Sequence, residues 1–192
     1  MAQNGWENYS EAYDYLDKQL KITSANDSST ISILYFVKSV YERSQANHNS
    51  ILSNLTKAIN YDSTFSHAYF HRGDLYRAYG KFDSAISDYQ YAIESFLLND
   101  EYVTWFGVAM KNMGYCHMRL SLSDTKMAPK LVKFHLIRAW SLSALAAVQL
   151  PNDHEILGHR LTIKLMLLKH GIPLDSVIEP FPERRGMKPR SR

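Results

Sequence analysis

The chain has 192 residues, of which 45% are hydrophobic and 21% charged, and its formal net charge is +3 at pH 7. This length and composition predict one continuous hydrophobic core, since the chain is too short for two domains of ordinary size. Its single cysteine excludes an internal disulfide framework and a zinc site built from paired thiolates, so we expect a cytoplasmic location. Because the sequence shows neither a basic start followed by an apolar run nor a stretch of about eighteen uninterrupted apolar residues, we expect neither secretion nor membrane insertion.

Residues 6–22 carry the pattern of an amphipathic helix. Aromatic and leucine side chains recur there at intervals of three and four residues: Trp6, Tyr9, Tyr13, Leu16 and Leu20. Stacked helical repeats leave an apolar face open at each end and need a helix with one polar side to cover it. We therefore predict that this helix caps the N-terminal end of the helical repeats described in the following paragraphs.

A break at Gly80 divides the segment from Ala68 to Ile93 into two stretches with helical spacing of apolar and small side chains. Gly73 on the first stretch and Ala85 on the second allow two helices to approach closely. The segment is therefore predicted to form two antiparallel helices.

Six side chains of this segment resemble the pattern of the tetratricopeptide-repeat family in their order and spacing. They are Tyr69, Gly73, Tyr76, Ala85, Tyr89 and Ala92. Two positions depart from the family pattern, since Arg72 stands where the family often has Leu and Leu98 where it often has Pro. The family period of about 34 residues also places Tyr35 over Tyr69 and Ala58 over Ala92.

The same register implies a degenerate repeat at about residues 32–65, with its break at residues 45–49, before the clear repeat at 66–99. Glu42 departs from the pattern in the earlier repeat. A third repeat is implied at residues 102–152, but its two helices are separated by about a dozen residues too many. The segment SLSDTKMAPK is therefore predicted to contain an insertion, either as a longer loop or as lengthened helices.

Residues 153–170 are predicted to form a C-terminal capping helix. Asp153 can cap its first turn, and Gly171 followed by Pro173 can end it. The core-facing stripe of this helix is expected to be Ile156, Leu157, Leu161, Leu165 and Leu168.

Residues 173–192 are predicted to form an irregular basic tail. The last ten residues contain five of the 22 basic groups and one of the 19 acidic groups, so their net charge is +4 and that of the remaining chain is −1. We favour a solubilising role for this tail, since five positive groups are few.

The resemblance also implies the fold class and the kind of function. The fold implied is all-α, a single domain at residues 1–172 built as a right-handed superhelix of antiparallel helix pairs, with about eight helices including both caps. The function implied is that of a non-catalytic protein–protein interaction module, such as an adaptor, scaffold or assembly factor. Such proteins usually bind a peptide or protein segment in a concave groove lined by the first helix of each pair.

Carrying the groove positions of the family over to this sequence gives a mixed aromatic and basic lining. The residues are Phe36, Val40, Phe70, His71, Asp74, Arg77, Lys111, Asn112, Tyr115 and Arg119. Such a lining suits a peptide with apolar and acidic groups, because aromatic rings supply contact area and Arg can bind a carboxylate with two hydrogen bonds. Phe36 and Val40 stand where some members have a Lys and Asn carboxylate clamp, so we expect no clamp of that type.

No set of residues predicts catalysis, a metal ion or a cofactor. His67 and His71 share a helix face and could be joined by His117, but the set has no thiolate or further acidic ligand at metal-binding spacing except Asp74. Cys116 is interpreted as a buried small hydrophobic residue, since no nucleophile signature accompanies it. We therefore expect a protein that is not an enzyme and needs neither metal nor cofactor.

Three other interpretations stay open. The basic tail could bind nucleic acid, which we disfavour, and such binding would weaken steeply with salt and disappear without residues 183–192. A hydrolase or transferase that uses the histidines would lose activity in His71→Ala. Self-association into a homo-oligomer could use the helices that contain Trp6 or Trp105. The sequence does not identify the partner.

Overall fold

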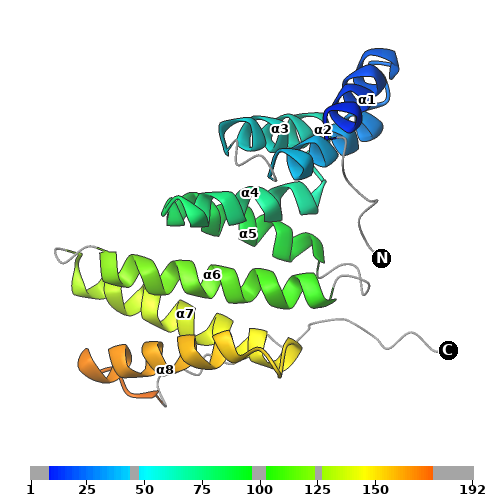
Figure 1. Cartoon of the computed structure of the whole chain (residues 1–192). Coiled ribbons are helices and arrows are strands. Elements are labelled where there is room, and N and C mark those ends of the chain that lie inside the picture. Colours follow the sequence, from blue (N-terminus) through cyan, green and yellow to red (C-terminus); the bar gives the residue numbers. More distant parts are fainter. Residues whose placement is uncertain (1–8, 44–47, 97–102, 124–126, 175–192) are drawn as a thin grey trace.

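The computed structural model describes residues 9–43, 48–96, 103–123 and 127–174, and within these ranges the chain forms eight α-helices and no strand. In chain order they are α1 (Tyr9–Ile22), α2 (Ser28–Arg43), α3 (His48–Tyr61), α4 (Ser66–Ala78), α5 (Phe82–Phe96), α6 (Val103–Ser123), α7 (Pro129–Gln149) and α8 (His154–Lys169). The helices form one stack that runs from α1, α2 and α3 at one end to α8 at the other (Figure 1). This confirms the predicted all-α architecture of stacked helix pairs.

Three helix pairs build the stack. The closest packing is within the pairs α2–α3, α4–α5 and α6–α7, and each pair packs on the next through α3–α4 and α5–α6. We call α2, α4, α6 and α8 the first helices, and α3, α5 and α7 the second helices. The first helix α4 also touches α6, and α6 touches α8, so the first helices follow one another along the stack. The helix α1 packs on α2, and α8 packs on α7.

The helix pair predicted around Gly80 is present. Gly80 has a φ of 70°, and the amide of Lys81 donates to the carbonyl of Tyr76 at 2.9 Å, which closes the turn between α4 and α5. A Cβ atom on Gly73 would lie 3.0 Å from Cε1 of Tyr89, so only glycine allows α5 to approach α4 this closely. Ala85 lies in the same core and packs with Tyr69, as the sequence pattern predicts.

Arg72, a departure from the repeat pattern, has a partner on the second helix. Its Nε and Nη2 atoms donate to the two carboxylate oxygens of Asp88 on α5, each at 2.8 Å. Asp88 is buried. A fork of two hydrogen bonds satisfies a carboxylate that would otherwise be buried without a partner, which is why a charged side chain is tolerated where an apolar one is common.

Glu42, the departure in the first pair, is also buried and joins three helices. It accepts hydrogen bonds from Tyr13 on α1, from Ser50 on α3, and from the Nδ2 atom of Asn54 on α3 at 2.8 Å. Because three donors from two neighbouring helices converge on one carboxylate, Glu42 fixes how α1 and α3 pack around α2.

The third pair differs from the others in the length of its helices. Both α6 and α7 have 21 residues, against 13 in α4 and 15 in α5. The extra residues predicted for the third repeat are therefore accommodated, at least in part, by lengthened helices; residues 124–126 between them lie outside the described part of the chain.

The C-terminal helix was predicted correctly in its bounds and wrongly in its buried face. Asp153 caps α8 by accepting from the amides of Glu155 and Ile156, and Gly171 ends it with a φ of 64°. The buried residues are Ile156, Ile163 and Leu167, so of the predicted stripe only Ile156 faces the core. The others, Leu157, Leu161, Leu165 and Leu168, are 57 to 60% exposed.

The helix α7 is, among the helices described, the one long and apolar enough to cross a membrane by length and composition alone. Buried helices of similar composition pass the same test. In this fold α7 packs between α6 and α8, with Leu136, Ala139 and Ala146 fully buried.

Candidate functional site

The residues predicted to line a groove come from three first helices, and side-chain contacts join many of them into one row. At the α2 end the row is aromatic. The ring of Phe36 on α2 lies 5.3 Å from the ring of His71 on α4, and His71 lies 5.9 Å from Trp105 on α6. The successive contacts place these three side chains on one face that crosses the stack.

In the middle of the row the groups are polar and already bonded to one another. Oδ1 of Asp74 accepts from the hydroxyl of Tyr89 at 2.6 Å and from Nδ2 of Asn112 at 2.9 Å. Nε of Arg77 donates to the same tyrosine hydroxyl at 3.2 Å. Asp74 and Asn112 therefore tie α4, α5 and α6 together.

At the α8 end the row turns aromatic and basic again. Nη1 of Arg119 donates to the hydroxyl of Tyr115 at 2.7 Å, and the Tyr115 ring lies 5.1 Å from His159 on α8. Lys111 donates to Asp153 and to Glu155, each at 2.9 Å. The charge of Lys111 is therefore compensated within the chain.

We use the term first-helix face for the surface on which these side chains lie. It consists of Phe36, Arg43, His71, Arg77, Trp105, Lys111, Tyr115 and Arg119. Val40 is exposed on the same helix as Phe36. Contact of any of these residues with a partner stays a prediction.

One predicted groove residue has a different place. Phe70 is 2% exposed and lies in the main core, with its ring 5.9 Å from Tyr89 and 5.2 Å from Trp105. It supports the row from beneath and is not available to a partner. Phe70 points about 100° away from His71 around the helix, toward Tyr89 of α5 and Trp105 of α6, and these two rings help to bury it.

Two residues of the first-helix face were missed by sequence reasoning. Trp105 is 37% exposed and packs edge-on against His67 at 5.5 Å, in addition to His71. Nη2 of Arg43, at the end of α2, lies 3.2 Å from Nδ1 of His71. Trp105 lies in the first turn of the unusually long α6, before the positions that the repeat register covers, and Arg43 lies at the last residue of α2.

The electrostatics leave positive charge at both ends of the row. Burial, with the nearby charge of Arg43, lowers the pKa of His71 to about 4, so His71 is neutral at pH 7 and its Nδ1 can accept from Arg43. Among the described residues, no carboxylate lies within ion-pair distance of Arg43 or Arg119. The first-helix face therefore presents aromatic surface with an uncompensated guanidinium at each end.

The groups considered as catalytic or metal-binding candidates do not form one cluster in the described part of the chain. Cys116 is fully buried, and burial raises the pKa of its thiol to about 12, which removes the thiolate at neutral pH. His117 does not join His67 and His71, because its Nδ1 lies 2.9 Å from Nδ1 of His135 on α7. In the described ranges, no group of three His, Cys, Asp or Glu residues is placed to hold a metal ion.

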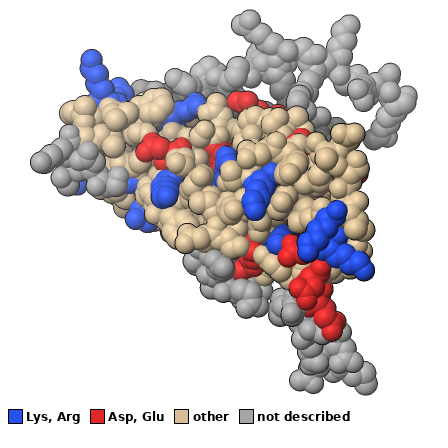
Figure 2. All heavy atoms as spheres, turned by 90° about the horizontal axis from the view of Figure 1, so that it is seen from above, with Lys and Arg blue, Asp and Glu red and all other residues tan. Residues whose placement is uncertain are grey.

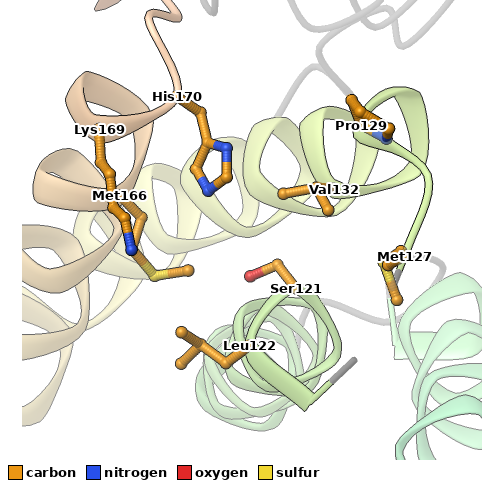
Figure 3. Close-up of a pocket in the computed structure, with 8 residues that line it drawn as sticks. All are labelled: Ser121, Leu122, Met127, Pro129, Val132, Met166, Lys169 and His170. Atoms are coloured by element: carbon orange, nitrogen blue, oxygen red, sulfur yellow. The ribbon is translucent and has the colours of Figure 1, made fainter. Parts of the chain in front are cut away.

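A separate hollow of about 350 Å³ lies where α6 ends and α7 begins, against the end of α8. Met166, Lys169 and His170 face Ser121 and Leu122 across it (Figure 3). Its lining is mainly apolar, and the hydroxyl of Ser121 already donates to the carbonyl of Met118 at 2.6 Å. Among its described lining residues, the hollow contains no carboxylate.

The nucleic-acid interpretation depends on residues that lie outside the described part of the chain, the basic groups of 183–192. Seen down the stack, acidic and basic side chains are interspersed on the visible face (Figure 2). No broad surface of one sign is visible on that face.

Comparison with known proteins supports the fold. No protein-family model matches the sequence, and no curated protein does. Among solved structures, the crystal structure of MamA, a helical solenoid of the tetratricopeptide-repeat type, is similar with a TM-score of 0.53 and 16% sequence identity. The match covers 77% of this chain and 67% of that one. At this identity the likeness shows a shared helix-pair solenoid fold.

Proposed function

We propose that this chain is a tetratricopeptide-repeat-type interaction module that binds a polypeptide segment on its first-helix face and acts by binding rather than by catalysis. The adaptor, scaffold or assembly role predicted from the sequence pattern is the form of this function that we favour. The MamA-like fold supports a protein-interaction role, and the single buried cysteine is our reason for proposing a cytoplasmic location.

The observation that carries the proposal is the partly exposed Trp105, held edge-on between rings of α4. A tryptophan in this setting offers a large apolar contact surface whose rotamer is already fixed, so little side-chain entropy is lost when a partner binds. Lys111 on the face and Asp74 in the middle of the row have their hydrogen-bonding groups engaged within the chain. Affinity should therefore come from the aromatic rings.

The ends of the face determine which peptides fit. Arg43 and Arg119 can donate paired hydrogen bonds to a carboxylate, and they lie at opposite ends of the aromatic row. The preferred ligand is thus a segment with apolar side chains in its middle and an acidic group near either end.

Selection from a displayed library of random peptides tests this. The chain should enrich peptides with aromatic or aliphatic residues next to Asp or Glu, and the double variant Trp105→Ala with Arg119→Glu should bind the selected peptides at least about tenfold more weakly. The matched control is Tyr15→Ala with Lys130→Glu, which likewise removes an aromatic ring and reverses a basic charge, at exposed positions on α1 and α7.

Circular dichroism must show the same melting behaviour for both double variants, so that lost binding is not lost folding. Equal binding by the Trp105 variant, or equal loss in the control, would exclude the first-helix face as the binding surface.

A further inference from the structure

The helix α8 has the place of a first helix for which the described part of the chain contains no second helix. In the second and third pairs, the first helix packs on the second helix before it and on its own second helix after it, as α4 does on α3 and α5. The helix α8 packs on α7 and touches α6 in the same way. In the described part of the chain, no helix follows α8.

The side of α8 turned away from α7 is apolar. Leu157, Leu161, Leu165 and Leu168 are each more than half exposed, and their spacing of four, four and three residues aligns them along one face of the helix. Four leucines in one exposed row form a contiguous apolar surface, which marks an interaction site more often than scattered single residues do.

A glycine beside this row matches a feature of two of the three complete pairs, in which the second helix approaches a glycine of the first helix closely. A Cβ on Gly73 of α4 would lie 3.0 Å from Cε1 of Tyr89 on α5, and one on Gly107 of α6 would lie 2.8 Å from Cβ of Gln149 on α7. A Cβ on Gly158 of α8 would instead meet open space, with no atom of the described chain within 4 Å. A helical glycine costs stability, and here nothing in the described chain approaches it closely.

The charges beside the row distinguish between a second copy of the chain and a different helix. Lys164 and Lys169 are exposed on α8, whereas Glu155 is bonded to Lys111 at 2.9 Å. If two copies paired antiparallel through the leucines, the two Lys164 side chains, close to the middle of the row, would face each other. A helix with acidic flanks would instead compensate both lysines.

From these observations we infer that the leucine face of α8 is a docking surface for an amphipathic helix of another protein, with an apolar stripe and acidic flanks, which completes a fourth helix pair. The inference concerns a surface other than the first-helix face and stands independently of ligand binding there.

The chain contains a suitable probe for this surface. Residues 82–96, the sequence of α5, form the second helix that packs on Gly73, and they hold three acidic groups, Asp83, Asp88 and Glu94, and no Lys or Arg. A fluorescent synthetic peptide of this sequence should bind the full chain in an anisotropy titration. The same peptide with all three acidic residues changed to Lys should bind about threefold to tenfold more weakly.

Three variants of the full chain locate the binding. Leu161→Gln with Leu165→Gln should weaken binding of the acidic peptide at least about tenfold. Gly158→Gln should also weaken it while leaving the melting temperature equal or higher, because the new side chain meets open space in the unbound chain. The matched control, Ile22→Gln with Val148→Gln, replaces two exposed apolar side chains elsewhere and should bind normally.

Several results would overturn the inference. One is failure of the acidic peptide to bind. Another is equal binding of that peptide to the unsubstituted chain and to the variant Leu161→Gln with Leu165→Gln. The inference also fails if sedimentation shows a dimer that the double variant abolishes, because the leucine face would then belong to a second copy. Flotation with anionic phosphatidylserine vesicles that depends on the same leucines would assign the face to a membrane surface instead.

Discussion

At the scale of single residues, the two charged departures from the repeat pattern are explained by their partners. Arg72 and Asp88 form a forked pair inside the second helix pair, and Glu42 gathers three donors inside the first. Neither arrangement is visible in spacing alone, because the partners come from a different helix. A repeat pattern predicts which positions lie close to a neighbouring helix. It does not predict that a charged or polar pair can replace an apolar contact at such a position.

The forked pair gives a stability prediction. Asp88→Ala should lower the free energy of unfolding by about 2 to 3 kcal/mol, because it leaves the largely buried guanidinium of Arg72 without its acceptor. The double variant Arg72→Leu with Asp88→Leu should lie close to the unsubstituted chain, since both charges are removed together. Urea unfolding followed by circular dichroism measures both, and a double variant as unstable as Asp88→Ala would contradict this account.

The buried histidine pair gives a prediction for pH. Burial, together with His135 and Arg138, lowers the pKa of His117 to about 3, whereas an unfolded histidine titrates near 6.5. The unfolded chain therefore binds more protons between these values, so the free energy of unfolding should fall by about 1 kcal/mol per pH unit between about pH 6.5 and pH 5 through this group.

Urea titrations at pH 7, 6 and 5 test this slope. His117→Leu should make it shallower. If the free energy of unfolding of the His117→Leu variant falls with the same slope as that of the unsubstituted chain, a group other than His117 causes the loss of stability.

At the scale of helices, close approach at glycine determines how the pairs pack. Gly107→Ala should destabilise the chain by about 1 to 3 kcal/mol, because the new Cβ would lie 2.8 Å from Cβ of Gln149 and the two helices would have to separate. Gly158→Ala should instead stabilise it by about 0.5 to 1 kcal/mol, since alanine favours helix and meets no neighbour. Thermal melts compare the stabilities of the two variants directly. Equal changes in melting temperature would show that close packing at Gly107 does not determine its effect.

The sequence was sufficient to predict where most helices lie along the chain, but not always which side of a helix is buried. The pair around Gly80 was predictable because a turn glycine, small residues and aromatics all agree in one segment. The buried face of α8 was not, because apolar residues occur on two sides of that helix and α7 covers the side that holds Ile163 and Leu167. Four leucines follow helical spacing equally well on the exposed side.

The candidate site was predictable in outline for a similar reason. The repeat register selected Phe36 with His71, and Arg77 with Tyr115, and the side chains of each of these pairs are in contact. It misplaced Phe70, because Tyr89 of α5 and Trp105 of α6 cover the side of α4 on which Phe70 lies. It missed Trp105, because the lengthening of α6 lies outside any repeat of fixed length.

At the scale of the whole molecule, stacking creates surfaces that no single helix has. The first-helix face exists only because α2, α4 and α6 follow one another at the same side of the stack, and the leucine face exists because the described stack stops at a first helix. The same rule of packing thus produces both proposed binding surfaces, one along the stack and one at its end.

The central claim is that a polypeptide ligand contacts the first helices, and NMR of the tryptophan indole N–H groups tests it most directly. Trp105 lies on the first-helix face and Trp140 on the second helix α7, where Arg160 lies 4.3 Å from its ring centre. On addition of a library-selected peptide, the indole signal assigned through Trp105→Phe should shift while that of Trp140 stays in place. Movement of the Trp140 signal with no change at Trp105 would contradict the claim.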